Sequence, residues 1–138
     1  MPKFGSILIV DDDYASNYLT EMILQDLQIT EHIYLARNGK EALDLIKDYC
    51  QYDQQPASKP CPQLIFLDIN MPVMDGFEFL EEFEKIEHIK KNPIPIFLLT
   101  TSTNVRDIEK AKRYQVSAYI EKPLTEEKIV KIMDTISI

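Results

Sequence analysis

Residue types that mark several protein classes are scarce in this chain of 138 residues. It has two cysteines and two histidines, and none lies at the spacing of a metal-ligating motif, which argues against a structural zinc site. No apolar run approaches the roughly 20 residues needed to cross a bilayer. The segment from Met1 to Ser6 is too short and too polar for a signal peptide, so we expect a cytoplasmic protein with no membrane partner.

Positive charge is also scarce, because 15 lysines and arginines stand against 23 aspartates and glutamates, for a formal net charge of -8. Proteins that bind the phosphate backbone usually carry a basic patch, and none is visible here, so we expect no nucleic-acid partner. The 45% share of hydrophobic residues is ordinary for a soluble globular protein. We predict a single domain over residues 1–138.

Cys50 and Cys61 flank a polar segment, residues 51–62, which contains three prolines. We interpret this segment as a loop, longer than the usual connection from a helix to a strand. Disulfides are rare in cytosolic proteins, so both cysteines are expected to be reduced thiols.

Short apolar runs alternate with helix-like patterns along the chain. The runs are bounded by polar residues, which is typical of strands buried on both faces of a sheet. They lie at residues 7–10, 33–36, 64–67, 96–99 and 118–121. This alternation favours a doubly wound α/β fold, in which five helices cover the two faces of one parallel five-stranded sheet.

Apolar spacing and capping residues place the five helices. Asn38, Asp75 and Thr125 are predicted to cap the second, third and fifth helices, and the fourth is predicted over residues 104–114. The positions expected to face the core are Ala15, Leu19, Ile23 and Leu27, with Tyr18 and Met22 beside them; Ala42, Leu43, Ile46 and Tyr49; Phe77, Leu80, Phe83 and Ile86; Ile108 and Ala111; and Ile129, Ile132, Met133 and Ile136.

Polar clusters follow four of the apolar runs. These clusters are Asp11-Asp12-Asp13, Asp68, Thr100-Thr101-Ser102 and Lys122-Pro123. Ligands of open parallel sheets bind just beyond the carboxyl ends of the strands, so we expect the clusters to meet at one site.

Asp11, Asp12 and Asp68 would repel one another unless a cation or a proton neutralised them. A few hard oxygen ligands, completed by water, suit Mg²⁺. A carboxylate beside such an ion can act as a nucleophile toward a phosphoryl group, with Lys122 as a second positive charge and Thr100 as a hydrogen-bond donor. The clusters therefore predict a magnesium site that contains a reactive carboxylate.

Taken in order, these motifs make the chain similar to the receiver domain of two-component response regulators. The matching segments are Asp11-Asp12, Asp68 with the following Ile-Asn-Met-Pro-Val-Met-Asp-Gly, Thr100-Thr101-Ser102, and Tyr119-Ile120-Glu121-Lys122-Pro123. The resemblance covers essentially the whole chain and implies a flavodoxin-like sheet with strand order 2-1-3-4-5. Because no output domain is visible, the chain resembles a stand-alone, CheY-like receiver.

The resemblance implies a role for each residue of the site. Asp68 would be the phosphoacceptor, which a sensor histidine kinase or a histidine phosphotransfer protein phosphorylates. The ligands of Mg²⁺ would be Asp11, Asp12, Asp68 and the backbone carbonyl of Asn70. Lys122 would pair with the phosphoryl group, and the peptide bond before Pro123 would be cis.

The resemblance also implies a switch. Thr100 would turn toward the phosphoryl group, and Tyr119 would follow from an outward to an inward rotamer. This would change the surface of the fourth helix, fifth strand and fifth helix, which binds an unknown downstream protein. Such a domain is not an enzyme with a separate substrate, but it catalyses its own phosphorylation and dephosphorylation.

One position departs from the family's usual pattern, and two others leave the dephosphorylation rate open. Thr101 stands where such domains usually have Ala or Ser, and its extra branch is expected to crowd access to the phosphoryl site. Asn70 and Ser102 lie where the family tunes the dephosphorylation rate, so the sequence does not fix the lifetime of the phosphoryl group.

Two other functions are alternatives for this sequence. Asp11-Asp12-Asp13 also fits the nucleophile motif of Asp-x-Asp phosphatases, although Ala15 stands where that family has Thr or Val, and Asp68 would then be unexplained. The second is a phosphorylation-independent receiver-like interaction module. Turnover of a phosphomonoester would favour the phosphatase, and the absence of any Mg²⁺-dependent acyl phosphate would favour the interaction module.

Overall fold

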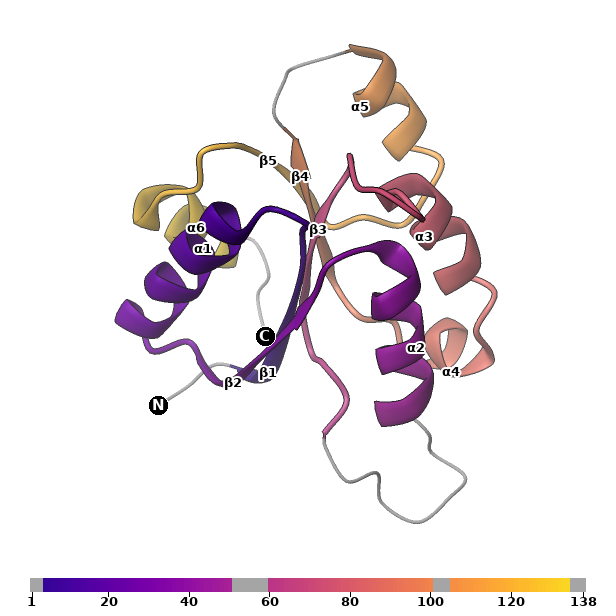
Figure 1. The fold of residues 1–138 in the computed structure, drawn as a ribbon, viewed down its shortest axis with the longest axis horizontal. Helices are drawn as coiled ribbons and strands as arrows, with labels where there is room; N and C mark the ends of the chain where they lie inside the picture. The colour runs from indigo at the N-terminus through magenta and orange to yellow at the C-terminus, as the bar shows by residue number, and fades with distance from the viewer. Residues whose placement is uncertain (1–3, 51–59, 101–104, 135–138) are drawn as a thin grey trace.

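A five-stranded parallel sheet forms the centre of the molecule, and helices cover both of its faces (Figure 1). The computed structural model describes residues 4–50, 60–100 and 105–134. The strands are β1 (Phe4–Val10), β2 (Thr30–Ala36), β3 (Ile65–Asp68), β4 (Ile96–Thr100) and β5 (Ala118–Glu121). All neighbours are parallel, and the spatial order is β2-β1-β3-β4-β5, which confirms the predicted fold class and strand order.

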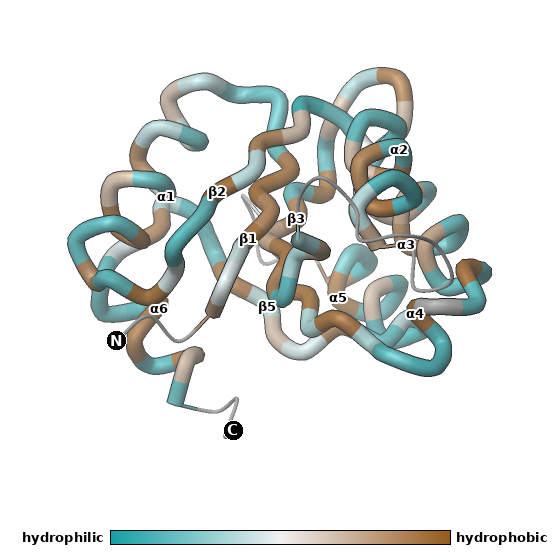
Figure 2. Tube along the Cα trace, turned by 90° about the horizontal axis from the view of Figure 1, so that it is seen from below, coloured by the Kyte–Doolittle hydropathy of each residue, from teal (hydrophilic) through white to brown (hydrophobic). Residues whose placement is uncertain are grey.

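Two helices lie on one face of the sheet, α1 (Tyr14–Asp26) and α6 (Glu126–Met133) (Figure 1). The opposite face carries α2 (Gly39–Tyr49), α3 (Gly76–Phe83), α4 (Glu87–Lys91) and α5 (Val105–Ala111). Because successive residues of a strand point to opposite faces, Ile7 and Ile9 join the core on the α1 side, and Leu8 and Val10 join the other core. Figure 2 shows the apolar stretches of β1 and β3 in brown, in the middle of the molecule.

The predicted helix caps are present. Asn38, Asp75 and Thr125 each accept a hydrogen bond from the backbone N–H three residues further along the chain. Asp75 and Glu78 also form a reciprocal capping box, in which the Glu78 carboxylate accepts from the Asp75 N–H at 3.1 Å. These bonds satisfy backbone donors that have no partner within the helix, and they fix where α2, α3 and α6 begin.

The predicted buried face of α1 is partly wrong. The buried residues of α1 are Asn17, Thr20, Ile23 and Leu24, whereas Tyr18, Leu19 and Met22 are exposed. The Asn17 amide donates to the Asp11 carbonyl, and the Thr20 hydroxyl donates to the Ser16 carbonyl, both at 2.9 Å. These hydrogen bonds allow two polar side chains to be buried. A prediction from the apolar pattern alone therefore turns the wrong face of α1 toward the core.

The prediction of five helices is also wrong, since the described residues form six. The segment that was expected to end the third helix contains a tight turn, in which the N–H groups of Lys85 and Ile86 donate to carbonyls three residues back. The chain then forms the five-residue helix α4, which buries Ile89 against the core. Ile86, which the sequence places on the buried stripe of the third helix, therefore lies in the turn between α3 and α4.

Cys50 and Cys61 form a disulfide with an S–S distance of 2.05 Å and a Cα–Cα distance of 4.7 Å, so the prediction of two reduced thiols is wrong. Cys50 caps the carboxyl end of α2, and Cys61 lies shortly before β3. Both side chains pack against the core on the α2 face. The packing of α2 on the sheet thus brings the two sulfur atoms together, whereas the prediction rested only on the expected compartment.

Several predictions concern residues outside the described parts of the chain. These are the loop at positions 51–59, Thr101, Ser102 and the core position Ile136. Within the parts that are described, no helix combines the length and the apolar character needed to cross a membrane.

We expect reduction of the disulfide to lower the free energy of unfolding by about 3 kcal/mol, because the bridge restricts the unfolded chain between two residues 11 positions apart. Urea unfolding of the oxidised and reduced protein, followed by far-ultraviolet circular dichroism, measures the difference. A Cys50→Ser/Cys61→Ser variant is the control and should not respond to the reductant. Equal unfolding free energies of the oxidised and reduced wild type would contradict the expectation.

Candidate functional site

The register of the sheet brings the predicted site residues to one edge. β1 and β3 are paired almost to their ends, so Asp11 and Asp68 emerge next to each other. Thr100 ends β4, and Lys122 directly follows β5 and donates its backbone N–H to the Thr100 carbonyl at 2.8 Å. Residues that are up to 111 positions apart in the chain are therefore assembled at the carboxyl ends of four neighbouring elements of one sheet.

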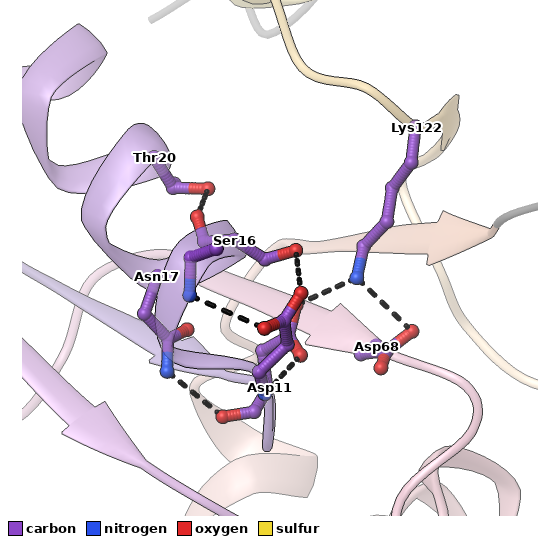
Figure 3. A network of polar contacts seen from close by, with 8 residues as sticks. Asp11, Ser16, Asn17, Thr20, Asp68 and Lys122 are labelled. Atoms are coloured by element: carbon purple, nitrogen blue, oxygen red, sulfur yellow. Dashed lines mark hydrogen bonds and ion pairs between the residues drawn. The ribbon is translucent and has the colours of Figure 1, made fainter.

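Three carboxylates and one lysine lie at this edge. Figure 3 shows the Lys122 side chain pointing toward Asp11 and Asp68. Carboxylate oxygens of Asp11, Asp12 and Asp68 lie within 4.8 Å of one another. Nζ of Lys122 lies 2.7 Å from Oδ2 of Asp11 and 3.7 Å from Oδ1 of Asp68. Asp11 and Asp68 are buried, with 1% and 5% of their surface exposed, and Asp12 is exposed. With all three carboxylates ionised, one ammonium group leaves two negative charges uncompensated.

This arrangement changes the pKa values of two groups. Burial, followed by the negative charge of Asp11, raises the pKa of Asp68 to about 6, although Lys122 counteracts part of the rise. Burial alone would lower the pKa of Lys122, but its hydrogen bond to Asp11 and the charge of Asp68 outweigh burial and raise it. Lys122 therefore stays positively charged. Its charge lowers the pKa of Asp68, but not enough to offset the rise that burial and Asp11 cause.

The chain around Asp68 is held by close backbone packing. A Cβ atom on Gly76 would lie 2.6 Å from the backbone oxygen of Asp68, so only glycine fits at the start of α3. Val73 has a φ of 67°, which is rare for a β-branched residue, in a turn closed by the Met74 N–H and the Pro72 carbonyl at 2.7 Å. The Asp75-Gly76 pair thus has the structural role that the sequence predicts.

Asp13 belongs to the helix rather than to the cation site. Its carboxylate accepts hydrogen bonds from the Ala15 N–H at 3.2 Å and from the Ser16 hydroxyl at 3.0 Å, and it caps α1. Asp13 is therefore a cap residue of α1, which argues against a direct role in holding a cation.

The donor set fits a divalent cation. Asp11, Asp12 and Asp68 offer hard carboxylate oxygens at one point, and their excess negative charge favours a small dication over a neutral ligand. Three protein oxygens leave room for water and for a phosphoryl oxygen, which suits Mg²⁺. The backbone carbonyl of Asn70 as a further ligand stays a prediction.

Thr100 and Tyr119 lie together, as the resemblance implies. Both line a small cavity of about 10 Å³, together with Ile69, Leu98, Asp107 and Ile108. Thr100 is buried at the end of β4, and the side chain of Tyr119 is 38% exposed. The peptide bond between Lys122 and Pro123 is cis, as the resemblance also implies.

One residue at the site was not predicted from the sequence. Asn17 is buried on α1, and Figure 3 shows its amide donating to the backbone carbonyl of Asp11. The only signal that could have revealed it is a polar residue one turn after the Asp11-Asp12-Asp13 cluster, at a position that faces the sheet.

The raised pKa of Asp68 predicts how stability depends on pH. The folded protein binds this proton more tightly than the unfolded chain, so the stability it contributes is fully present below about pH 4 and is lost as the pH rises through about 6. We expect Asp68→Asn to increase the free energy of unfolding by about 2 kcal/mol near pH 7.5, and to change it little near pH 4. Urea unfolding in the presence of a chelator measures this difference.

Addition of Mg²⁺ serves as the control for this prediction. A dication near Asp68 favours the ionised carboxylate, so the wild type should recover much of the difference at neutral pH. An Asp68→Asn variant that gains the same amount at both pH values would show that the pKa of Asp68 is not the cause.

Comparison with known proteins agrees with this geometry. The family model of the response regulator receiver domain matches residues 7–134. Response regulator Rcp1 of Synechocystis sp. is 32% identical over 116 residues, which are 84% of this chain and 75% of that protein.

Solved structures agree as well. A two-component response regulator from Cytophaga hutchinsonii has a TM-score of 0.80 and 28% identity, and 96% of each chain is covered. The Mn²⁺-bound form of Rcp1 has a TM-score of 0.73 at 29% identity, covering 96% of this chain and 91% of that one. The phosphorylated cyanobacterial phytochrome response regulator RcpA has a TM-score of 0.75 at 29% identity, covering 96% and 90%. The family match spans nearly the whole chain, and it agrees with the parallel sheet and the acidic cluster described above. The chain therefore belongs to the CheY-like receiver domains of two-component response regulators.

Proposed function

We propose that this receiver domain is a signalling switch in which Asp68 accepts a phosphoryl group from a sensor histidine kinase or a histidine phosphotransfer protein, in a Mg²⁺-dependent reaction. The observation that carries the proposal is the buried carboxylate of Asp68, which lies within 4.8 Å of two further carboxylates and 3.7 Å from a lysine. The Mn²⁺-bound Rcp1 and the phosphorylated RcpA support the metal and the phosphoryl group by similarity.

The proposed transfer follows from these charges. A carboxylate oxygen of Asp68 attacks the phosphorus atom, the phosphorus–nitrogen bond of the donor imidazole breaks, and its electron pair stays on the nitrogen. Lys122 offsets charge on the phosphoryl oxygens, and the Thr100 hydroxyl donates to one of them. Mg²⁺, when bound, supplies the positive charge that lets a phosphoryl group approach the three carboxylates. Attack of water on phosphorus later restores Asp68, so the domain catalyses both steps on itself.

The surface beside the site supports a protein as the phosphoryl donor. Tyr18, Leu19 and Met22 of α1 are exposed apolar side chains, which surfaces without a partner rarely group together. A groove of about 270 Å³ connects this part of α1 to the site, and it is lined by Ser16, Leu19, Thr20, Lys122, Pro123 and Leu124. A donor helix with apolar side chains around its phosphohistidine would cover this surface and reach Asp68.

The proposed switch passes from Thr100 to Tyr119. A cavity of about 10 Å³ is smaller than a phenol ring, so Tyr119 can turn inward only if its neighbours on α5 move. The surface formed by α5, β5 and α6 would change as a result and would bind a downstream protein. We further propose a cytoplasmic location without a membrane partner. We expect no nucleic-acid partner, because the net charge is -8.

Acyl-phosphate formation tests the proposal directly. We expect a small phosphodonor such as acetyl phosphate to give a Mg²⁺-dependent shifted band on a phosphate-retarding gel, and Asp68→Asn to give no such band. Asp75→Asn is the matched control, because it alters an aspartate of the same loop while asparagine still caps α3, and it should be labelled like the wild type.

Three results would count against the proposal. Equal labelling of Asp68→Asn would show that the phosphoacceptor is another residue. Turnover of a phosphomonoester would favour a phosphatase. The absence of a band, combined with no response to a stable phosphoryl mimic, would favour a phosphorylation-independent interaction module.

Thr100→Ala separates phosphorylation from switching. We expect this variant to be labelled, because Asp68 and the cation site are intact, but to lose most of the structural response. Hydrogen exchange of Val105–Ala111 and Ala118–Glu121, with and without the phosphoryl mimic, measures that response. A Thr100→Ala variant whose exchange changes as much as that of the wild type would contradict the proposed route.

A further inference from the structure

Asn17 has a buried polar side chain whose presence the roles above do not explain. It lies on α1 with only 6% of its surface exposed. Its Nδ2 donates to the backbone carbonyl of Asp11 at 2.9 Å, but its buried Oδ1 has no hydrogen-bond partner among the residues that the structure describes. A buried acceptor without a partner destabilises the fold, so an apolar residue of similar size would serve packing better.

The hydrogen bond to Asp11 fixes the orientation of this amide. With the amide reversed, Oδ1 would face the Asp11 carbonyl, and two acceptors would oppose each other. The unpartnered oxygen is therefore a consequence of directing the donor at Asp11. The hydrogen bond to the Asp11 carbonyl therefore comes together with an unfavourable buried oxygen.

The carbonyl that Asn17 holds belongs to the peptide group between Asp11 and Asp12. These two residues supply two of the three carboxylates of the cation site. The same turn contains two further bonds, because the Asp13 N–H donates to Oδ1 of Asp11 and the Asn17 N–H donates to the Asp13 carbonyl, both at 3.0 Å. Asn17 thus connects the rigid part of α1 to the peptide group that sets the direction of both side chains.

We propose that Asn17 is a positioning residue of the cation site, which increases Mg²⁺ affinity by holding the Asp11–Asp12 peptide group. The inference rests on the proposed Mg²⁺ site. Asn17 touches neither the cation nor the phosphoryl group in this account, and it acts only through Asp11 and Asp12. Groups that orient metal ligands in this way typically change metal affinity by about 10- to 100-fold.

Asn17→Leu tests the inference, since it removes both the donor and the unpartnered acceptor and keeps the same branched side-chain skeleton. We expect the dissociation constant of Mg²⁺, measured by isothermal titration calorimetry, to rise about 10-fold or more. The urea midpoint in the presence of a chelator should stay close to that of the wild type, because the lost hydrogen bond and the removed unpaired oxygen have opposite effects. Asn17→Ala provides a second variant that introduces no bulk.

Thr20→Val is the matched control. Thr20 is buried on the same side of α1, about one turn further along, and its hydroxyl donates to the Ser16 carbonyl of its own helix. We expect this variant to bind Mg²⁺ like the wild type. Equal weakening of Mg²⁺ binding in Thr20→Val and Asn17→Leu would mean that any disturbance of α1 has this effect, and it would overturn the inference.

Phosphorylation by acetyl phosphate gives a second readout. At saturating Mg²⁺, Asn17→Leu should reach a rate within about twofold of the wild type, because only cation affinity is impaired. A rate that stays low at saturating Mg²⁺ would instead place Asn17 in the transfer step and overturn the positioning role. Unchanged Mg²⁺ affinity of Asn17→Leu would overturn the inference alone, whereas a wild type that binds no Mg²⁺ would overturn the proposed function with it.

Discussion

Repulsion between the carboxylates of Asp11, Asp12 and Asp68 is the constraint that shapes the functional edge of this sheet. Lys122 reduces it through contacts of 2.7 and 3.7 Å with Asp11 and Asp68, but a single ammonium group cannot neutralise three carboxylates. Burial raises the pKa of Asp68 to about 6, and repulsion from Asp11 adds to the rise, because Lys122 offsets only part of it. The fold therefore keeps a site that any additional positive charge would stabilise. That property suits the role proposed for Asp68, which is to meet a cation and a phosphoryl group.

The surrounding structure tolerates local strain to maintain this site. Val73 adopts a φ of 67° in the loop after Asp68, and the approach of α3 leaves no space for a side chain at Gly76. Asn17 keeps a buried oxygen without a partner on the opposite side of the acidic cluster. A residue held in such a sparsely populated backbone region costs roughly 1–3 kcal/mol and persists only where its surroundings enforce it. These unfavourable features adjoin β1 and β3, whose ends carry the carboxylates, and the regular core below them carries the stability.

The sequence predicts the sheet and the site well because both depend on short-range patterns. Apolar runs identify the strands, and Asp11, Asp68, Thr100 and Lys122 stand at their ends, so a parallel sheet brings them together whatever its details. Features that depend on tertiary packing were not predicted. The buried face of α1 is set by hydrogen bonds of Asn17 and Thr20, and α4 arises from a turn inside an apparently continuous pattern. The disulfide depends on where the packing of α2 places Cys50, which no argument from composition contains.

The distribution of packing also explains why a charge at Asp68 would act at the surface of α5 and β5 rather than elsewhere. α3 buries five residues, among them Phe79 and Leu80, whereas α5 buries only Ala111 and β5 only Ile120. Elements with few buried contacts need the least free energy to move. Thr100 ends the strand beside β5, and its cavity is bounded by α5 through Asp107 and Ile108. A shift of Thr100 toward Asp68 would therefore act on a helix that buries a single residue, and the firmer packing of α2 and α3 would confine the response there.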